Sequence, residues 1–399
     1  MPGNRIPNLA RSWSRIDGVD CLRALAILYV LLNHIHLQLL FAHVPYSARL
    51  PQSLVAALVW QGQRGVQIFF AVSGFLITAT TLRRWKTPAQ VRIRDFYLIR
   101  FARIAPLFLT LLAVLCLLHL AHVPHFVVPA RVGGLRSALW AALTLRVGLL
   151  EARRGYLPGS WDILWSLSVE EMFYLFFPLV CRLLGRGKGL VLVLIAFVAL
   201  GPFARTVFTH GNPVWREYSY LGGMDAIALG CLTALFLAGR QLSRRLTRTL
   251  AVCGIALLAF CLCFQPLVEI LRLEELGLDM TIVAVGACMV IAASATTRWH
   301  APRALNFLLA YGRRSYEIYL THMFVVIACF ALFIRLGKPL LLVPVVFLLI
   351  IALSGVLGEL VARFYSEPAN QWLRARFGDG PATLGSVVQP DPGPDTVTP

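Results

Sequence analysis

Long apolar stretches separated by short polar segments dominate the pattern along this chain of 399 residues. A helix needs about 20 apolar residues to cross a hydrocarbon core of about 30 Å. Windows of this kind fall at 21–41, 60–82, 101–122, 161–184, 189–208, 220–239, 250–267, 279–297, 315–334 and 339–364. The pattern therefore predicts an all-α integral membrane protein with ten transmembrane helices, forming one membrane domain over 21–364.

Composition and charge agree with a membrane protein and suggest its orientation. Hydrophobic residues make up 58% of the chain and charged residues 14%, against roughly 25% charged residues in soluble domains. The formal charge of +18 is concentrated in alternate connections between the windows. Cytoplasmic loops of membrane proteins carry such an excess of Lys and Arg. Both termini are therefore predicted in the cytoplasm, as a segment 1–20 and a tail 365–399, and nucleic acid is not an expected partner.

Two regions depart from the ten-helix pattern. The stretch 135–150 is half apolar and contains Arg136 and Arg146, which favours an interfacial or re-entrant segment over a spanning one. If this stretch crosses the membrane instead, the predicted orientation of every later helix is reversed. The tail after 378 is rich in Pro and Gly and poor in large apolar residues, and this composition predicts disorder.

The cysteines and histidines do not indicate a metal centre. All nine cysteines fall in or at the edges of the apolar windows, where a thiol behaves as a small hydrophobe. His119, His122 and His125 have i, i+3 spacing, but no matching carboxylate or fourth ligand follows. Neither a disulfide framework nor a metal site is expected.

The first window carries two chemically active residues on one face. In "DCLRALAILYVLLNHIHL", Arg23 and His34 are eleven positions apart, which on a helix is a rotation of about 20° and a rise of about 16 Å. Charged side chains within a span face the bundle interior or a wet cavity, so this face is predicted to line a cavity. Alternatively, Arg23 snorkels to the headgroups and His34 is a hydrogen-bonded core histidine.

A basic segment leads into the third window. In "RDFYLIRFARIAPLF", Arg100 and Arg103 are three positions apart and hence neighbours on one helix face. Paired guanidinium groups suit phosphate recognition, and coenzyme A is the phosphate-rich acyl carrier of the cytosol. The alternative is that the pair anchors the helix to lipid headgroups.

The fourth window contains two adjacent carboxylates, Glu170 and Glu171, in "SWDILWSLSVEEMFYLFFP". Adjacent positions differ by about 100° around a helix, so the two side chains point in different directions. A protonated glutamic acid could form a hydrogen bond to a neighbouring helix. Because burying two adjacent glutamates in a span is costly, at least one of them is predicted to form an ion pair with Arg23, Arg100 or Arg103.

Further polar residues fall in the later windows. Asp225 lies early in the sixth, in "YLGGMDAIALG". Glu317 and His322 lie in the ninth, where Ser315 shares a stripe with His322 and Glu317 does not. Taken alone, His322 is predicted to be a satisfied core histidine.

Together these motifs resemble the bacterial membrane acyltransferase-3 type of O-acyltransferases. The resemblance covers most of the chain and rests on "RIDGVDCLRALAILYVLLNH", "GVQIFFAVSGFLIT", "IRFARIAPLF", "WSLSVEEMFYLFFP", "MDAIALG" and "SYEIYLTHM". Two positions depart from the pattern: Gln67 stands where many relatives have Asp, which puts an acidic role there in doubt, and Met172 stands where many have Gln. The chain is similar to the stand-alone class without a C-terminal extracytoplasmic domain.

The resemblance implies transfer of an acyl group, commonly acetyl, from cytoplasmic acyl-CoA to a hydroxyl of a carbohydrate, glycolipid or related acceptor. It also implies a multi-pass protein of the bacterial inner membrane, with acetyl-CoA as donor and no metal. A transporter or flippase without chemistry is the alternative, because intramembrane charges and many spans are shared with carriers. The absence of an inverted repeat in the sequence argues against it.

The resemblance makes Arg23 and His34 the functional pair of the first helix and Arg100 and Arg103 the donor-binding pair. His34 is the expected general base, because imidazole titrates near neutral pH, and Arg23 could polarise the thioester carbonyl or guide pantetheine. The predicted catalytic residues are thus Arg23, His34, Glu170 and Glu171, with Ser73, Asp225 and His322 as further candidates. Two schemes remain open. In one, pantetheine reaches a site near His34; in the other, the acyl group is first bound covalently to Ser73. A serine beside a glycine in a span also commonly serves helix packing.

Overall fold

The structure, a computed structural model, describes residues 15–297 and 299–377, and every regular element in that part of the chain is a helix. Nine of its helical segments are long and apolar enough to cross a membrane. These are α1 (Asp17–Phe41), α2 with α3 (Gln52–Val59, Gly62–Trp85), α4 (Ile93–Leu120), α7 with α8 (Gly159–Asp162, Leu164–Leu184), α10 with α11 (Pro213–Tyr218, Tyr220–Leu237), α12 (Arg244–Cys263), α14 (Asp279–Thr297), α16 (Ser315–Arg335), and α17 (Val343–Val361) continuing into α18 (Glu367–Phe377).

The remaining predicted window, 189–208, is the apolar helix α9 (Gly189–Arg205) of 17 residues. At 1.5 Å per residue it is about 26 Å long, slightly short of a typical span. The prediction of an all-α membrane protein is confirmed. The helix boundaries also lie close to the predicted ones, and α14 covers 279–297 as expected.

The ambiguous stretch 135–150 forms two short helices, α5 (Gly134–Leu143) and α6 (Val147–Arg154). Between them Leu145 adopts a positive φ of 60°, a left-handed backbone conformation that ends a helix. At about 15 Å and 12 Å neither helix is long enough to span. α5 packs on α4, and α6 packs on α8 and α10.

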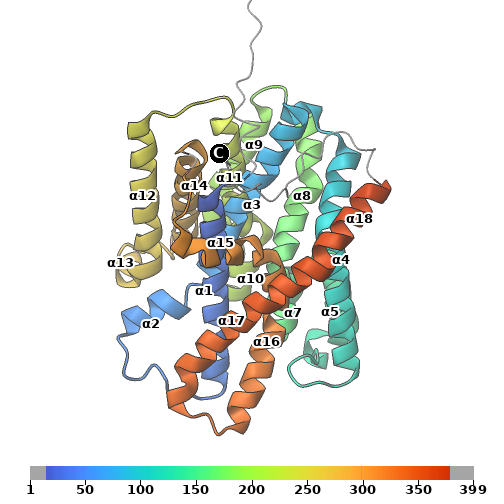
Figure 1. The fold of residues 1–399 in the computed structure, drawn as a ribbon, viewed down its shortest axis with the longest axis vertical. Coiled ribbons are helices and arrows are strands. Elements are labelled where there is room, and N and C mark those ends of the chain that lie inside the picture. Colours follow the sequence, from blue (N-terminus) through green and yellow to red (C-terminus); the bar gives the residue numbers. More distant parts are fainter. Residues whose placement is uncertain (1–14, 298, 378–399) are drawn as a thin grey trace, which may run out of the picture.

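Helix α3 forms the centre of the bundle, packed between α1, α11 and α14 (Figure 1). Its contact with α11 depends on two glycines. A Cβ at Gly74 would lie 1.9 Å from the carbonyl oxygen of Ile227, and one at Gly230 would lie 2.0 Å from that of Ala71. Small residues allow such close backbone approach between membrane helices, and this packing fixes the face of α3 that carries Ser73.

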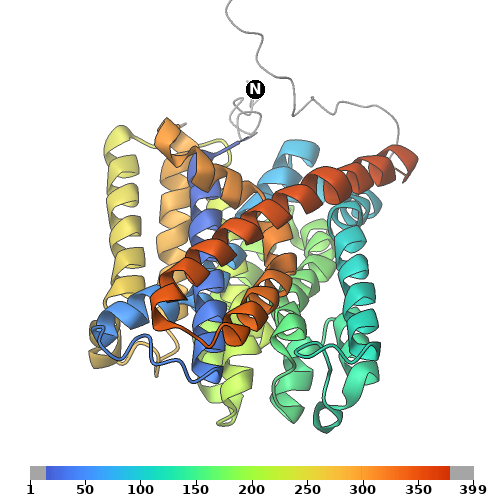
Figure 2. The same cartoon turned by 60° about the horizontal axis from the view of Figure 1, so that its bottom comes forward.

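The C-terminal part of the described chain is helical beyond the last predicted window. The last predicted window ends at 364, and 365–399 is expected to be a tail, but the helix of α17 continues through the π-helical turn Ala362–Ser366 into α18. Figures 1 and 2 show α17 and α18 as one long rod that crosses the bundle diagonally, and α18 packs against α4. The predicted disorder after 378 lies outside the described residues.

Basic side chains gather at one end of the bundle, where α1 begins, α3 ends and α4 begins. Arg15, Arg83 and Arg84 line cavities there. We call this end the basic end; Figure 2 shows the start of α1, the end of α3 and the rod of α18 together on this side.

Candidate active site

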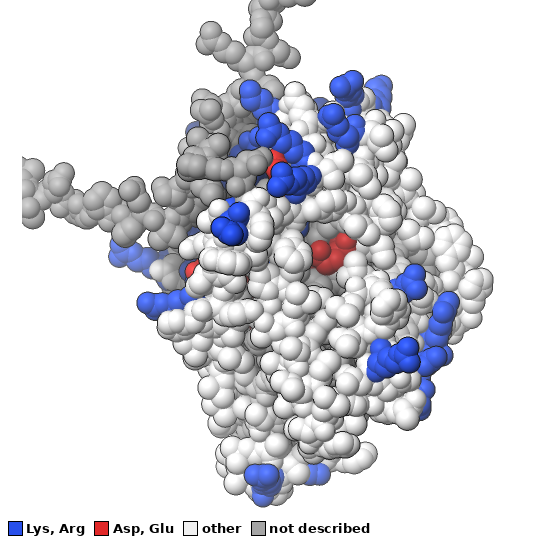
Figure 3. Space-filling view, turned by 90° about the vertical axis from the view of Figure 1, so that its right-hand side faces the viewer, with Lys and Arg blue, Asp and Glu red and all other residues white. Residues whose placement is uncertain are grey.

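A cavity of about 480 Å³ opens at the basic end and extends into the bundle. Its walls come from α3, α4, α8 and α16, with single residues from α1 and α18. The structure thus brings together six polar residues from helices far apart in sequence: Arg23, Ser73, Arg100, Arg103, Glu170 and Tyr174. We call this the central cavity. Viewed from the side of α4 and α18, Figure 3 shows acidic atoms in a hollow surrounded by uncharged surface, with basic side chains above it.

Ser73, Glu170 and Tyr174 form a hydrogen-bonded group on one wall. The Ser73 hydroxyl bonds both the Glu170 carboxylate and the Tyr174 hydroxyl, and Tyr174 also donates to Glu170. The Arg100 guanidinium lies 3.9 Å from the centroid of the Tyr174 ring, within range of a cation–π interaction. The group links α3, α8 and α4 and places a serine hydroxyl beside a carboxylate.

The predicted ion pair of Glu170 or Glu171 with an arginine is wrong. Within 15–297 and 299–377 the only charged-group pairings run between other residues, and Glu170 accepts from two hydroxyls instead. Arg100 stacks on the tyrosine ring rather than reaching the carboxylate. Glu171 points elsewhere, as adjacent helix positions require: it is not among the described residues lining the central cavity, and its Oε1 is buried without a partner.

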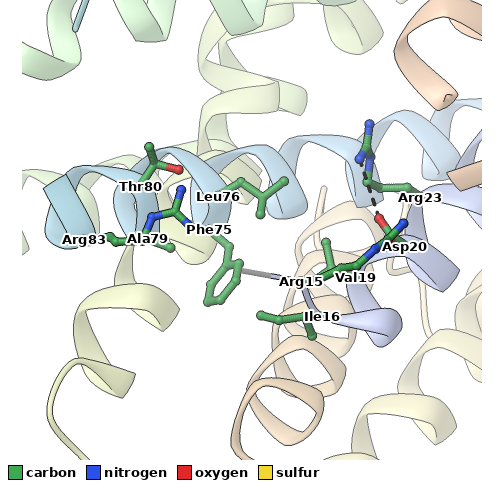
Figure 4. Close-up of a pocket in the computed structure, with 10 residues that line it drawn as sticks. All are labelled: Arg15, Ile16, Val19, Asp20, Arg23, Phe75, Leu76, Ala79, Thr80 and Arg83. Carbon is green, nitrogen blue, oxygen red and sulfur yellow. Dashed lines mark ion pairs between the residues drawn. The ribbon is translucent and has the colours of Figure 1, made fainter. Parts of the chain in front are cut away.

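Arg23 lies inside the bundle and is not a snorkelling residue. Its side chain is only 14% exposed, its Nε donates to the Ser315 hydroxyl at 3.1 Å, and its Nη1 lies 3.7 Å from a carboxylate oxygen of Asp20. Arg23 also lines a second cavity of about 190 Å³ at the basic end. Figure 4 shows Arg23 and Asp20 paired at one side of this smaller cavity and Arg83 at the other.

His34 of α1 and His322 of α16 form a pair, with ring centroids 5.0 Å apart in an edge-to-face arrangement. Nδ1 of His34 lies 2.8 Å from the Val30 carbonyl oxygen, and Nδ1 of His322 lies 2.7 Å from that of Tyr319. Because a carbonyl oxygen only accepts hydrogen bonds, Nδ1 carries the proton in each neutral ring and Nε2 carries the lone pair. The interpretation of His322 as satisfied is wrong, since its Nε2 is buried without a partner.

Tyr319 lies between the histidine pair and the central cavity. Its side chain lines the cavity, and its ring centroid is 5.9 Å from that of His322. Its hydroxyl is held by the Ser166 hydroxyl at 2.6 Å and donates to the Ile163 carbonyl at 2.9 Å. The histidines are therefore one aromatic ring away from the cavity wall. Arg23 lines the central cavity, whereas His34, predicted to line it as well, lies behind Tyr319.

Asp225 lies in a structural network outside the cavity. It is fully buried and accepts hydrogen bonds from Arg205 at 2.8 Å, from Gln67 Nε2 at 2.8 Å and from Thr281 at 2.6 Å. These contacts join α11 to α9, α3 and α14. They also account for Gln67: its amide donates to Asp225, whereas an aspartate there would place a second carboxylate against the first.

Sequence reasoning missed several of these residues. Arg205 forms the ion pair with Asp225. Its position within the apolar window 189–208 could have indicated a buried, paired arginine. Tyr319 and Ser166 appeared as ordinary helix residues. Arg374 of α18 lines the central cavity but fell in the predicted tail.

The described residues contain no group of three or more His, Cys, Asp and Glu side chains that could hold a metal ion. His119 instead accepts a hydrogen bond from the Val128 amide at 3.0 Å through Nδ1. The site therefore consists of arginines, hydroxyls, one carboxylate and an imidazole pair, which is a set suited to acyl transfer through general-base catalysis.

The sequence matches the family model of an acyltransferase domain, Acyl_transf_3, over residues 16–359. The chain belongs to this acyltransferase family. The predicted resemblance is thereby confirmed, and the match covers the helices that form the central cavity, except α18.

Two curated relatives illustrate the similarity. O-acetyltransferase OatA of Staphylococcus aureus is 23% identical over 371 residues, covering 89% of this chain and 57% of the relative. Peptidoglycan O-acetyltransferase OatA of Listeria monocytogenes is 24% identical over 382 residues, covering 89% of this chain and 56% of the relative. The chain thus spans little more than half the length of these proteins. No solved structure matches it.

Proposed function

We propose that this protein is a membrane-bound O-acyltransferase that moves an acetyl group from acetyl-CoA to a hydroxyl of a carbohydrate, glycolipid or related acceptor. Family membership supports acyl transfer, and the names of the relatives support acetyl and a glycan acceptor. The observation that carries the proposal is the central cavity, which has arginines at its mouth and a histidine pair behind its inner wall.

The orientation follows from the charges. Arginines gather at the basic end, and positive charge is retained on the cytoplasmic side of membranes. We place this end, and both termini, in the cytoplasm of a bacterium, with ten helices including α9 in its inner membrane. The residues 21–364 would then form the membrane domain, and the donor would enter from the cytoplasm.

In this mechanism Arg100 and Arg103 bind donor phosphates, and the pantetheine arm extends into the cavity toward Tyr319. Arg23, three helical turns nearer the basic end than His34, guides the pantetheine arm as it passes into the cavity. Nε2 of His34 takes the proton of the acceptor hydroxyl while its oxygen bonds the carbonyl carbon. The tetrahedral intermediate then collapses, the carbon–sulfur bond breaks, and the imidazolium returns its proton to the departing thiolate. His322 orients His34 and shields it from lipid.

Transfer is direct in this scheme, and Ser73 with Glu170 positions Tyr174 and Arg100 rather than carrying the acetyl group. The carrier hypothesis loses support because family membership indicates acyl chemistry. In addition, the polar residues Arg23, Ser73, Arg100, Arg103, Glu170 and Tyr174 line one cavity at the basic end.

The test uses the purified full chain in nanodiscs with acetyl-CoA labelled in the acetyl group. Free thiol and the label on peptidoglycan fragments and on lipid-linked sugars are measured together. We expect thiol release that depends on the acceptor, with the label recovered as an alkali-labile ester. Absence of thiol release with every acceptor, together with glycan movement across proteoliposome membranes, would favour a carrier.

A further inference from the structure

Helix α18 lies beyond the residues 16–359 matched by the family model, yet it is fixed to the site. Arg314, directly before α16, donates through Nε to Glu359 at 2.7 Å and through Nη1 to Glu367, the first residue of α18. The next residue, Ser315, accepts the hydrogen bond from Arg23. The helix is thus held at its start by the same turn that holds a predicted catalytic residue, and along its length it packs on α4.

Arg374 projects from α18 into the central cavity. It lines the cavity together with Arg84, Arg100 and Arg103, and its Nε is buried without a hydrogen-bond partner. Arg376, two positions further on, is exposed and does not line the cavity. The helix therefore presents one arginine to the cavity and one to its surroundings.

Of the six arginines that line the central cavity, only Arg23 has an ion-pair partner among the described residues; Arg83, Arg84, Arg100, Arg103 and Arg374 have none within 4 Å. Every ion pair within 15–297 and 299–377 involves other arginines or a histidine. The one carboxylate on the described cavity wall, Glu170, is bonded by Ser73 and Tyr174. Like charges gathered in a partly buried site repel one another, and an anion carrying several negative charges would offset this repulsion.

We propose that Arg374 binds a phosphate of the acyl-CoA donor, so that α18 completes the donor site at its cytoplasmic mouth. This rests on the proposed function. Coenzyme A carries a pyrophosphate and a 3′-phosphate at its nucleotide end, and arginine binds phosphate through charge-assisted hydrogen bonds. The acetyl thioester lies at the opposite end of the donor, so Arg374 affects donor affinity and not the chemical step.

The experiment compares R374A with R376A, its neighbour on the same helix, in nanodiscs of phosphatidylcholine. Two donors are used: acetyl-CoA, and acetyl-pantetheine, which lacks the nucleotide phosphates. We expect R374A to raise KM for acetyl-CoA about tenfold with kcat unchanged, as loss of one charged hydrogen bond implies. KM for acetyl-pantetheine should stay the same, R374K should partly restore affinity, and R376A should match wild type.

Equal KM for acetyl-CoA in R374A and R376A would overturn the proposal, as would equal losses with both donors, which indicate a structural role. Binding of CoA itself is measured in parallel. If wild type binds CoA without turning over acetyl-CoA, the proposed function fails, while a weaker affinity in R374A alone still supports this site. If wild type does not bind CoA, both fail.

The other source of phosphate at the mouth is an anionic lipid headgroup. Adding phosphatidylglycerol to the nanodiscs separates the two. If the headgroup occupies Arg374, CoA binding weakens with this lipid in wild type but not in R374A, and the proposal is overturned. We expect the same ratio of affinities between the two proteins in both lipid mixtures.

Discussion

At the scale of single residues, two features determine which chemistry the site can support: which ring nitrogens of the histidine pair carry protons, and which side chains hydrogen-bond to Ser73. The backbone carbonyls that face Nδ1 leave Nε2 of His34 as the basic nitrogen. Ser73 is instead tied to Glu170 and Tyr174. A serine held in this way could accept an acyl group, so the choice between direct transfer and an acyl-serine needs an experiment.

Direct transfer predicts that Ser73→Ala keeps turnover within about tenfold of wild type, since the variant loses hydrogen bonds to Glu170 and Tyr174 but no reacting group. Rapid mixing with labelled acetyl-CoA in the absence of acceptor, followed by intact-mass measurement, should detect no acetylated enzyme in wild type. Ser168→Ala, a buried serine of α8 outside the cavity lining, is the control. A burst of thiol in wild type that Ser73→Ala abolishes would establish the covalent route.

At the scale of elements, close packing of α3 on α11 sets the position of the wall that carries Ser73. We predict that Gly74→Ala destabilises the protein by about 1–3 kcal/mol, the usual cost of overpacking. The reason is that its Cβ would lie 1.9 Å from the Ile227 carbonyl oxygen. Gly187→Ala, whose Cβ meets nothing within 4 Å, is the matched control. Thermal unfolding in detergent measures the difference, and equal melting temperatures for the two variants would contradict the packing.

A second prediction at this scale concerns α6, which lies outside the candidate spans. Burial, and then the nearby charge of Asp162, raises the pKa of the Glu151 carboxyl well above its ordinary value of 4.5. Its Oε1 accepts a hydrogen bond from the Leu157 amide, and the Asp162 carboxyl lies close enough to share the retained proton. The folded protein therefore retains a proton that the unfolded chain releases above 4.5. The free energy of unfolding consequently falls as pH rises from that value toward the raised pKa.

Glu151→Gln keeps the accepting oxygen and removes the titration. We expect its apparent melting temperature to fall less than that of wild type as the pH rises above 4.5. The exposed Glu269→Gln should follow wild type. If Glu151→Gln and wild type show the same slope, another group causes the pH dependence.

At the scale of the whole molecule, the sequence predicted what the bilayer imposes and missed what depends on contacts between helices. Apolar runs located the spans, because span length is set by the hydrocarbon thickness, but they missed polar first turns such as Ile93–Arg100 of α4 and the extension into α18. The alignment of Arg23 and His34 follows from one helix alone. Their partners Ser315 and His322 lie on α16, and no spacing within α1 reveals them.

The same limit explains the errors. The ion pairs expected for Glu170 and Glu171 failed because hydroxyls from α3 and α8 satisfy Glu170 first. Helix α18 is eleven residues long and amphipathic, so hydropathy alone does not distinguish it from a tail. Its arginine, Arg374, becomes informative only where the fold places it in a cavity with five others.

The most direct test of the central claim is a paired measurement of acetyl transfer and CoA binding in nanodiscs for His34→Ala and for the double variant Arg100→Ala, Arg103→Ala. We predict that His34→Ala loses transfer by about 100-fold or more, the usual contribution of a general base, and binds CoA with wild-type affinity. The double variant should lose binding. His36→Gln, on the same helix but facing Tyr46 and Trp60, should retain both. Transfer at the wild-type rate by His34→Ala would contradict the mechanism.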